Sequence, residues 1–327
     1  MRIRTDFRSI IKGYQRISFF TGNFTRYFMP DAIFKSIFRH EEKRLSDEER
    51  SEIVRRVDYY ARLTPESKVD RQKSVSVGEF HFPWKEKHKF TTYFFDLYEC
   101  VRCFPAKCRF EYQMGDIEET FDSPTFAKAR PITDSYSNTV LLPLNKVRHF
   151  RFIDDKRQFG EKRDMIVFRN VVKRQPWRTL FLEKFIDNPM CDVGQINKDA
   201  PAPRFVKPYI PMEEMLDFKF IACIEGHDVA TNLKWVMSSN SIAVMPKPRI
   251  ESWFMEGTLI PDYHYIEVKA DYSDLIEKLN YYIAHPDEAQ AIIEHAHEYV
   301  RPFRNRKREL LIARMTAGRY FEQTGQL

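Results

Sequence analysis

The chain has 327 residues, of which 53 are Lys or Arg and 47 are Asp or Glu, so its formal net charge is +6. Hydrophobic residues make up 43% of it, which is enough to bury sizeable cores and argues against general disorder. Its 10 glycines are too widely spaced to form a P-loop or a GxGxxG fingerprint, so any nucleotide is bound in another way. At about 150 residues per domain, the length predicts two domains or one large one.

No apolar run approaches the roughly 18 residues that a membrane span needs, and no export signal is visible. We therefore expect a soluble, cytoplasmic protein with reduced cysteines. Cys100, Cys103 and Cys108 are clustered, but no fourth ligand follows at zinc spacing, which favours thiols buried among aromatic side chains.

The first 30 residues are basic, with six Lys or Arg against one Asp. Apolar residues recur there at helical spacing, which leaves two interpretations open: a helix lying on an anionic membrane, or a helix facing the core with a solvated basic side. Further on, Ser46 and Glu49 form a predicted capping box that starts a helix running to about residue 63.

The sequence predicts an irregular mixture of helix and strands in the middle of the chain and a regular alternation of strands and helices in the second half. An aromatic helix is expected at 91–104, and strands are expected at 74–82, 109–114 and 139–142. Beyond residue 164, strands are expected at 165–168, 192–196, 218–224, 242–245 and 265–268. Helices are expected between them at 178–186, 212–216, 231–238 and 251–255. This alternation is typical of a doubly wound parallel sheet with helices on both faces.

Three helices are expected to close the chain, at 271–284, from residue 286, and at about 306–322. We predict an N-terminal acceptor-side domain at 1–160, a Rossmann-like donor-binding domain at 161–300, and a basic C-terminal helix at 301–327 that packs back on the body. In open α/β sheets, ligands bind beyond the carboxyl ends of the strands, which directs attention to the loops at 169–177, 225–231, 246–250 and 269–273.

Several ordered motifs carry a family resemblance. They are Pro124-x-Phe126-x-Lys128-x-Arg130-Pro131-Ile132, Leu141-Leu142-Pro143-Leu144-Asn145-Lys146-x-Arg148-His149, Glu225-Gly226, Leu233-Lys234, Trp253-Phe254, Leu259-Ile260-Pro261, His264-Tyr265 and Asp271-x-x-Asp274-Leu275. Together they cover about residues 91–303. The pattern resembles glycosyltransferase family 90, which includes protein O-glucosyltransferases, fungal capsule-associated proteins and bacterial lipopolysaccharide-modifying enzymes.

The resemblance implies a GT-B-like α/β fold, with two facing Rossmann-like domains and C-terminal helices. It also implies an inverting, metal-independent transfer of a glucose-type or xylose-type sugar from a UDP-sugar to a hydroxyl, with no cofactor. We expect a lipid-linked or polysaccharide acceptor, such as lipopolysaccharide core or capsule, and peripheral contact with the inner face of an anionic cytoplasmic membrane. The residues agree in one respect, because no D-x-D clamp for a metal-bound diphosphate is present.

Cationic side chains and loop amides must then neutralise the leaving diphosphate. The predicted donor-binding residues are Lys128, Arg130, Arg148, Arg169, Arg174, Gly226, Asp228, Thr231, Asn232, Lys234 and Glu251. Asp228 or Thr231 is expected to cap the helix after Gly226, and Glu251 to accept the ribose hydroxyls. For each cation taken singly, a solvated surface charge stays open as the alternative.

Inverting transfer needs a carboxylate that deprotonates the acceptor hydroxyl. Asp116, which follows Met114-Gly115 at the end of a predicted strand, is the first candidate, and Asp122 and Glu99 follow. A turn residue that bonds its own backbone is the alternative for Asp116.

Two other functions remain open at this stage. The basic composition also suits a non-catalytic protein that binds nucleic acid or an anionic membrane, although no nucleic-acid-binding motif is visible and nucleic acid is not expected. A degenerate transferase is the other alternative, because Asn170 and Asn232 stand where better-known members carry Gly and Arg.

Overall fold

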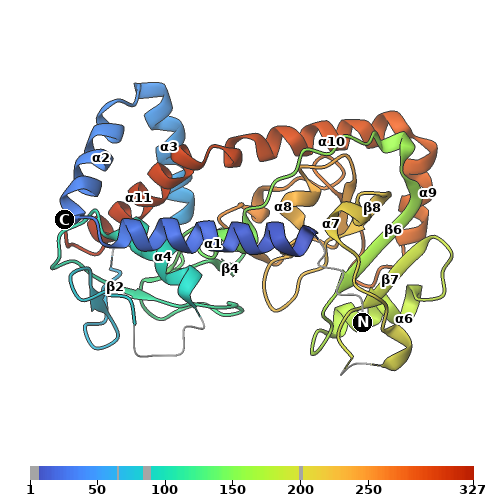
Figure 1. The fold of residues 1–327 in the computed structure, drawn as a ribbon, viewed down its shortest axis with the longest axis horizontal. Helices are drawn as coiled ribbons and strands as arrows, with labels where there is room; N and C mark the ends of the chain where they lie inside the picture. Colours follow the sequence, from blue (N-terminus) through green and yellow to red (C-terminus); the bar gives the residue numbers. More distant parts are fainter. Residues whose placement is uncertain (1–6, 65, 84–89, 199–201) are drawn as a thin grey trace.

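The computed structural model of the protein describes residues 7–64, 66–83, 90–198 and 202–327, and for residues 7–16 the backbone alone (Figure 1). Arg2 and Arg4, which belong to the predicted basic N-terminal segment, lie outside these ranges. Within them, no helix has the length and apolar composition needed to cross a bilayer.

The N-terminal half packs helices around a small mixed sheet. Its helices are α1 (Phe7–Tyr27), α2 (Asp31–Lys43), α3 (Asp47–Tyr60), α4 (Thr91–Val101) and the short α5 (Lys146–His149). Its strands are β1 (Val75–Ser76), β2 (Arg109–Tyr112), β3 (Thr125–Ala127) and β5 (Thr139–Leu141), in the order β1-β2-β3-β5. The β1 strand is antiparallel to β2, and the other pairs are parallel.

The C-terminal half confirms the predicted parallel sheet. Its five strands lie in the order β11-β9-β8-β6-β7, and every neighbouring pair is parallel. They are β6 (Arg163–Asn170), β7 (Cys191–Gln195), β8 (Phe218–Ala222), β9 (Ile242–Met245) and β11 (Ile266–Glu267). The first connection places β7 on one side of β6, and the second connection, from β7, places β8 on the other side of β6. The strand order therefore reverses between β6 and β8.

Helices cover both faces of this sheet because its strands are apolar on both sides. One face packs against α6 (Pro176–Phe185), α9 (Leu275–Ala284) and α10 (Pro286–Val300), through strand residues such as Ile166 and Phe220. The other face packs against α7 (Met212–Met215) and α8 (Leu233–Val236), through residues such as Val167 and Ile221. The apolar core on this second face continues into the N-terminal half, so the two halves share apolar packing.

A two-stranded antiparallel ribbon joins the halves. It consists of β4 (Ala129–Pro131) and β10 (Ile250–Ser252). The helix predicted at 251–255 is wrong, because β10 occupies its first residues and pairs with a strand of the other half. Single helical turns complete the chain: η1 (Phe159–Glu161), η2 (Pro203–Phe205), η3 (Glu256–Thr258) and η4 (Arg301–Arg304).

Helix ends follow the local sequence signals. The capping box at the start of α3 is confirmed, since Ser46 Oγ accepts from the Glu49 amide and Glu49 returns a bond to the Ser46 amide. Pro286 is the first residue of α10, as expected. The last helix, α11 (Arg306–Gln323), lies beside α3 at the end of the molecule opposite β6 and β7 (Figure 1).

Candidate functional site

The carboxyl edges of the two sheets meet at one charged cluster. Asp116 follows β2, Asp228 follows β8, and Lys128 stands between β3 and β4. Lys128 Nζ lies 2.8 Å from Asp116 Oδ1 and 3.1 Å from Asp228 Oδ2. The Asp228 loop leaves the parallel sheet at β8, where the strand order reverses, which is the place where ligands bind in such sheets.

The three side chains differ sharply in exposure. Lys128 is 4% exposed and Asp228 is 5% exposed, whereas Asp116 is 52% exposed. Asp228 is held further by the backbone amides of Ile117 and Val229. The buried ammonium group of Lys128 therefore contacts two carboxylates directly, one half-exposed and one buried.

The electrostatics keep Asp116 ionised. Partial burial opposes its charge, but the hydrogen bond and charge of Lys128, with the nearby Arg148 guanidinium and a last contribution from His227, hold the pKa of Asp116 below its usual value. Burial outweighs the same ammonium group at Asp228 and raises its pKa. Burial also opposes the charge of Lys128, but the two carboxylates and Tyr93 raise its pKa, so it stays protonated. The cluster thus presents a fixed negative oxygen to solvent.

Arg130 and Glu251, both predicted to bind donor, are partners of each other in the interior. Arg130 Nε lies 2.8 Å from Glu251 Oε1, directly across the β4–β10 ribbon, and both side chains are essentially buried. The remaining Arg130 nitrogens donate to the carbonyl oxygens of Tyr59, Tyr60 and Thr139. In this structure the pair fastens the two halves together rather than facing a ligand.

Lys234 and Arg169 are also engaged within the protein. Lys234 Nζ lies 3.0 Å from Glu256 Oε1, and both groups are buried. Arg169, near the end of β6, pairs with Asp192 at 2.5 Å and donates to the Pro208 carbonyl. It therefore ties β6 to β7 and to the chain that follows β7.

The loop after β8 is shaped differently from the prediction. The helix α8 begins at Leu233 and has no side-chain cap, so the capping role predicted for Asp228 or Thr231 is wrong. Asp228 bonds to Lys128 and local amides instead, and Asn232 Nδ2 donates to the Ala222 carbonyl at 3.0 Å. The Gly226 amide donates to the Asp228 carbonyl, which closes a tight turn.

Two predicted donor cations keep exposed guanidinium groups. Arg148 lies in α5, close enough to Asp116 to lower its pKa, and Arg174 lies in the loop between β6 and α6. Neither forms an ion pair with an acidic side chain in the described part of the chain. Asp122 is exposed and contributes its carbonyl oxygen to a bond from Asn138. Glu99, the third base candidate, pairs with Lys146 at 2.8 Å.

Arg178 and Trp177, in the first turn of α6, join the two loops at this edge. Arg178 donates to the carbonyl oxygens of Val171, Ile224 and Glu225, and its burial lowers its pKa to about 10. The indole of Trp177 donates to the same Glu225 carbonyl at 2.8 Å. The sequence gave no sign of the role of Arg178, because backbone carbonyl partners leave no residue pattern.

His149 ends one of the motifs that carry the family resemblance, but the sequence assigned it no role at the site. It is buried next to the cluster, and its Nε2 has no hydrogen-bond partner within the described ranges. Burial, together with the positive charges of Lys128, Lys234 and Arg148, lowers its pKa well below the usual value, so the ring is neutral. An unpaired buried nitrogen at the meeting point of the halves is a polar group available to a ligand.

The five cysteines lie in the interior of the protein. All five cysteines are buried and unpaired, and burial raises the pKa of Cys100 to about 12, so it is an unreactive thiol. Over the described residues, no group of three or more His, Cys, Asp or Glu side chains is arranged to hold a metal ion.

Comparison with known proteins identifies the class. A sequence model described as Glycosyl transferase family 90 matches residues 149–307, which include the whole parallel sheet. The O-glucosyltransferase LpsA of Dichelobacter nodosus is 37% identical over 279 residues, which cover 85% of this chain and 86% of that protein. The protein is therefore a glycosyltransferase. More particularly, the chain belongs to glycosyltransferase family 90, as its motifs indicated.

Two viral proteins match shorter parts. The uncharacterized protein 179R of Invertebrate iridescent virus 6 is 32% identical over 131 residues, which are 38% of this chain and 11% of that protein. The uncharacterized protein 027R of Frog virus 3 is 28% identical over 104 residues, which are 30% of this chain and 10% of that protein. Family membership favours an enzyme over the non-catalytic binding protein that composition alone allowed.

Proposed function

We propose that this enzyme transfers a glucose-type or xylose-type sugar from a UDP-sugar to a hydroxyl of a bacterial surface glycan, such as lipopolysaccharide core or capsule. The transfer inverts the anomeric centre and uses no metal ion. The likeness to a bacterial O-glucosyltransferase over most of both chains supports the sugar and the reaction. The two sheets, whose carboxyl edges meet at Lys128, support a GT-B-like arrangement with the acceptor on one side and the donor on the other.

The half-exposed, ionised carboxylate of Asp116 is the observation that carries this proposal. As the acceptor hydroxyl attacks the anomeric carbon, its proton passes to Asp116, and the bond to UDP breaks on the opposite side. A pKa below the usual value keeps Asp116 charged in the free enzyme but makes it a weak base. A substrate that covers Asp116 removes water from it and thereby raises its proton affinity.

Arg148 and Arg174 are the proposed partners of the leaving diphosphate. A guanidinium group offers paired donors that match phosphate oxygens, and its positive charge stabilises UDP as it departs. Both arginines remain uncommitted to acids in the described ranges, unlike Arg130, Arg169 and Lys234. Lys128 acts on Asp116 instead of on the donor.

Replacement of Asp116 by Asn tests the catalytic assignment. We expect Asp116→Asn to lower the rate of sugar transfer by about 10²–10⁴-fold, because the amide cannot take the proton, and to keep UDP affinity. Product formation from UDP-glucose and UDP titration by calorimetry measure the two effects. The matched comparison is Asp122→Asn in the same loop: loss of transfer there, with full activity in Asp116→Asn, moves the base to Asp122.

Ligand-induced stabilisation tests the donor. Thermal melts with UDP, GDP, CMP and ADP, each with and without EDTA, need no knowledge of the acceptor, since a ligand that binds only the native state raises its apparent stability. We expect a UDP-selective increase in melting temperature that EDTA does not change. A selective response to another nucleotide, or one abolished by EDTA, contradicts the proposed donor or the metal-free reaction.

A further inference from the structure

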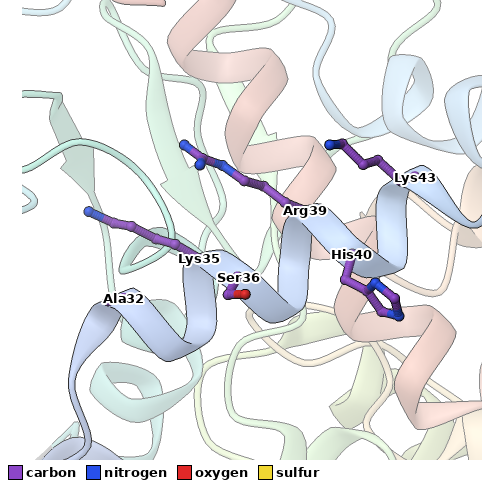
Figure 2. Close-up of a pocket in the computed structure, with 6 residues that line it drawn as sticks. All are labelled: Ala32, Lys35, Ser36, Arg39, His40 and Lys43. Atoms are coloured by element: carbon purple, nitrogen blue, oxygen red, sulfur yellow. The ribbon is translucent and has the colours of Figure 1, made fainter.

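The outer side of α2 carries a row of basic side chains. Lys35, Arg39 and Lys43 are four residues apart, so they follow one side of the helix and point the same way in Figure 2. A shallow hollow of about 460 Å³ along this helix is lined by Ala32, Lys35, Ser36, Arg39, His40 and Lys43. The three cations form no ion pair with an acidic group elsewhere in the described chain.

The acidic residues of α2, by contrast, are all engaged with arginines of neighbouring elements. Asp31 lies 2.6 Å from Arg102 and Glu41 lies 3.5 Å from Arg314, and both arginine side chains are only 3% exposed. Glu42 pairs with an arginine of α3 at 3.8 Å. The negative charges of the helix are thus neutralised from within, and its outward charge is positive.

Apolar side chains are also exposed on this helix, on the other side of its solvent-facing strip from the basic row. Ile33 is 40% exposed and Ile37, one turn later, is 43% exposed, while Met29 in the preceding turn is 38% exposed. The helix packs against the core through Phe34 and Phe38, which are buried, so the isoleucines do not contribute to that packing. At 100° per residue, the isoleucines and the cations border opposite sides of the same solvent-facing strip. Ile33 and Ile37 are one helical turn apart, so together they expose apolar surface on one side of this strip.

We propose that this outer side of α2 docks the enzyme on an anionic lipid bilayer. The cations match anionic headgroups, and the isoleucines match the boundary between headgroups and acyl chains. Nucleic acid would satisfy the cations but would leave the isoleucines in water. A second copy of the same face would bring like charges together. The role of this docking rests on the proposed function, because a transferase held at the membrane can reach a lipid-linked acceptor there.

Vesicle co-sedimentation of the full chain tests the docking. The probes are vesicles of phosphatidylglycerol with phosphatidylethanolamine, and vesicles of phosphatidylcholine as the neutral reference. We expect binding to the anionic vesicles only. The triple variant Lys35→Gln, Arg39→Gln, Lys43→Gln should bind them on the order of a hundredfold more weakly, at roughly fivefold per removed charge. The double variant Ile33→Ser, Ile37→Ser should also bind more weakly, with the cations intact.

A matched control removes three equal charges elsewhere. Arg301, Arg306 and Lys307 are exposed on η4 and α11, and their replacement by Gln gives the same net charge as the α2 triple. We expect this control to bind vesicles like the parent protein. Equal loss in both triples, loss in the control alone, or binding of the parent to RNA but not to vesicles overturns the proposal.

The docking and the proposed reaction can fail separately. Hydrolysis of UDP-glucose in solution needs no membrane, so the α2 triple should retain it, and thermal melts verify that each variant is folded. Vesicle binding without turnover of either UDP-glucose or UDP-xylose leaves the docking in place and contradicts the proposed donor. Turnover without vesicle binding supports the proposed donor and contradicts the docking.

Discussion

Lys128 illustrates how one buried side chain can set the chemistry of an exposed one. Its ammonium group lies within 3.1 Å of carboxylates from both halves of the chain, yet only Asp116 reaches solvent. A lysine in this place is a positioning residue, because it acts on the reacting hydroxyl through Asp116. Its removal should therefore change the pH dependence of the reaction as well as the stability of the protein.

We expect Lys128→Met to lower the free energy of unfolding by about 3–5 kcal/mol, since it leaves the buried Asp228 carboxylate without a counter-charge. It should also raise the pKa of Asp116. Activity that requires ionised Asp116 is lost as pH falls through that pKa, so the acid limb of kcat/KM should move to higher pH. The double variant Lys128→Met, Asp228→Asn should recover stability and keep the moved limb. An unmoved limb in the folded double variant contradicts the role of Lys128.

The candidate site was partly predictable from residue types. Asp116, Lys128 and Asp228 were selected from the sequence, and the structure brings them together. Arg130 and Glu251 were selected as two separate ligands, but they pair across 121 residues of chain. Sequence spacing shows which cations and carboxylates exist, and it does not show which of them neutralise one another after folding.

At the scale of elements, the turn before β11 depends on a neutral histidine. His264 Nδ1 accepts a hydrogen bond from the Ile260 amide at 2.9 Å, which it cannot do when protonated. Burial, with a smaller effect of His295, lowers the pKa of His264 to about 4, against 6.5 in the unfolded chain. The unfolded state therefore takes up the proton first as pH falls.

Stability should consequently be full above pH 6.5 and decrease as pH falls from 6.5 to about 4. We expect this histidine to account for about 1–3 kcal/mol of that loss, since its partial exposure weakens the effect. Chemical unfolding at several pH values measures it. His264→Asn offers the Ile260 amide an acceptor that does not titrate, so it should flatten the curve in this interval. An equally steep curve in that variant assigns the loss to other groups.

Local signals predicted the elements that owe least to distant contacts. The strand β9 matches its predicted range of 242–245, and the capping box of α3 formed as expected. The strands β3 and β4 were missed because Lys128 and Arg130 make that segment look like a polar loop. Their charges are neutralised by Asp228 and Glu251, which come from the other half. The same distant pairing turned the helix predicted at 251–255 into β10.

At the scale of the whole molecule, the chain crosses between its two halves more than once. The ribbon of β4 and β10 links them, and the last helix returns from the C-terminal half to the N-terminal one. On α11, Tyr320 and Phe321 pack against Phe126 of β3, with ring centroids 4.3 and 6.3 Å apart. The core of the N-terminal half is therefore completed by residues more than 150 positions beyond it.

This packing makes the N-terminal half dependent on the rest of the chain. We expect a fragment of residues 1–160 to lack cooperative unfolding, because it loses the buried face of α11 and the Glu251 carboxylate that neutralises Arg130. Circular dichroism and thermal melts of the fragment test this. Co-expression with residues 161–327 should restore a folded complex, since the missing surfaces are then supplied in trans. A fragment that melts cooperatively by itself would show that the N-terminal core is complete without α11, and the two halves would then behave as independent domains.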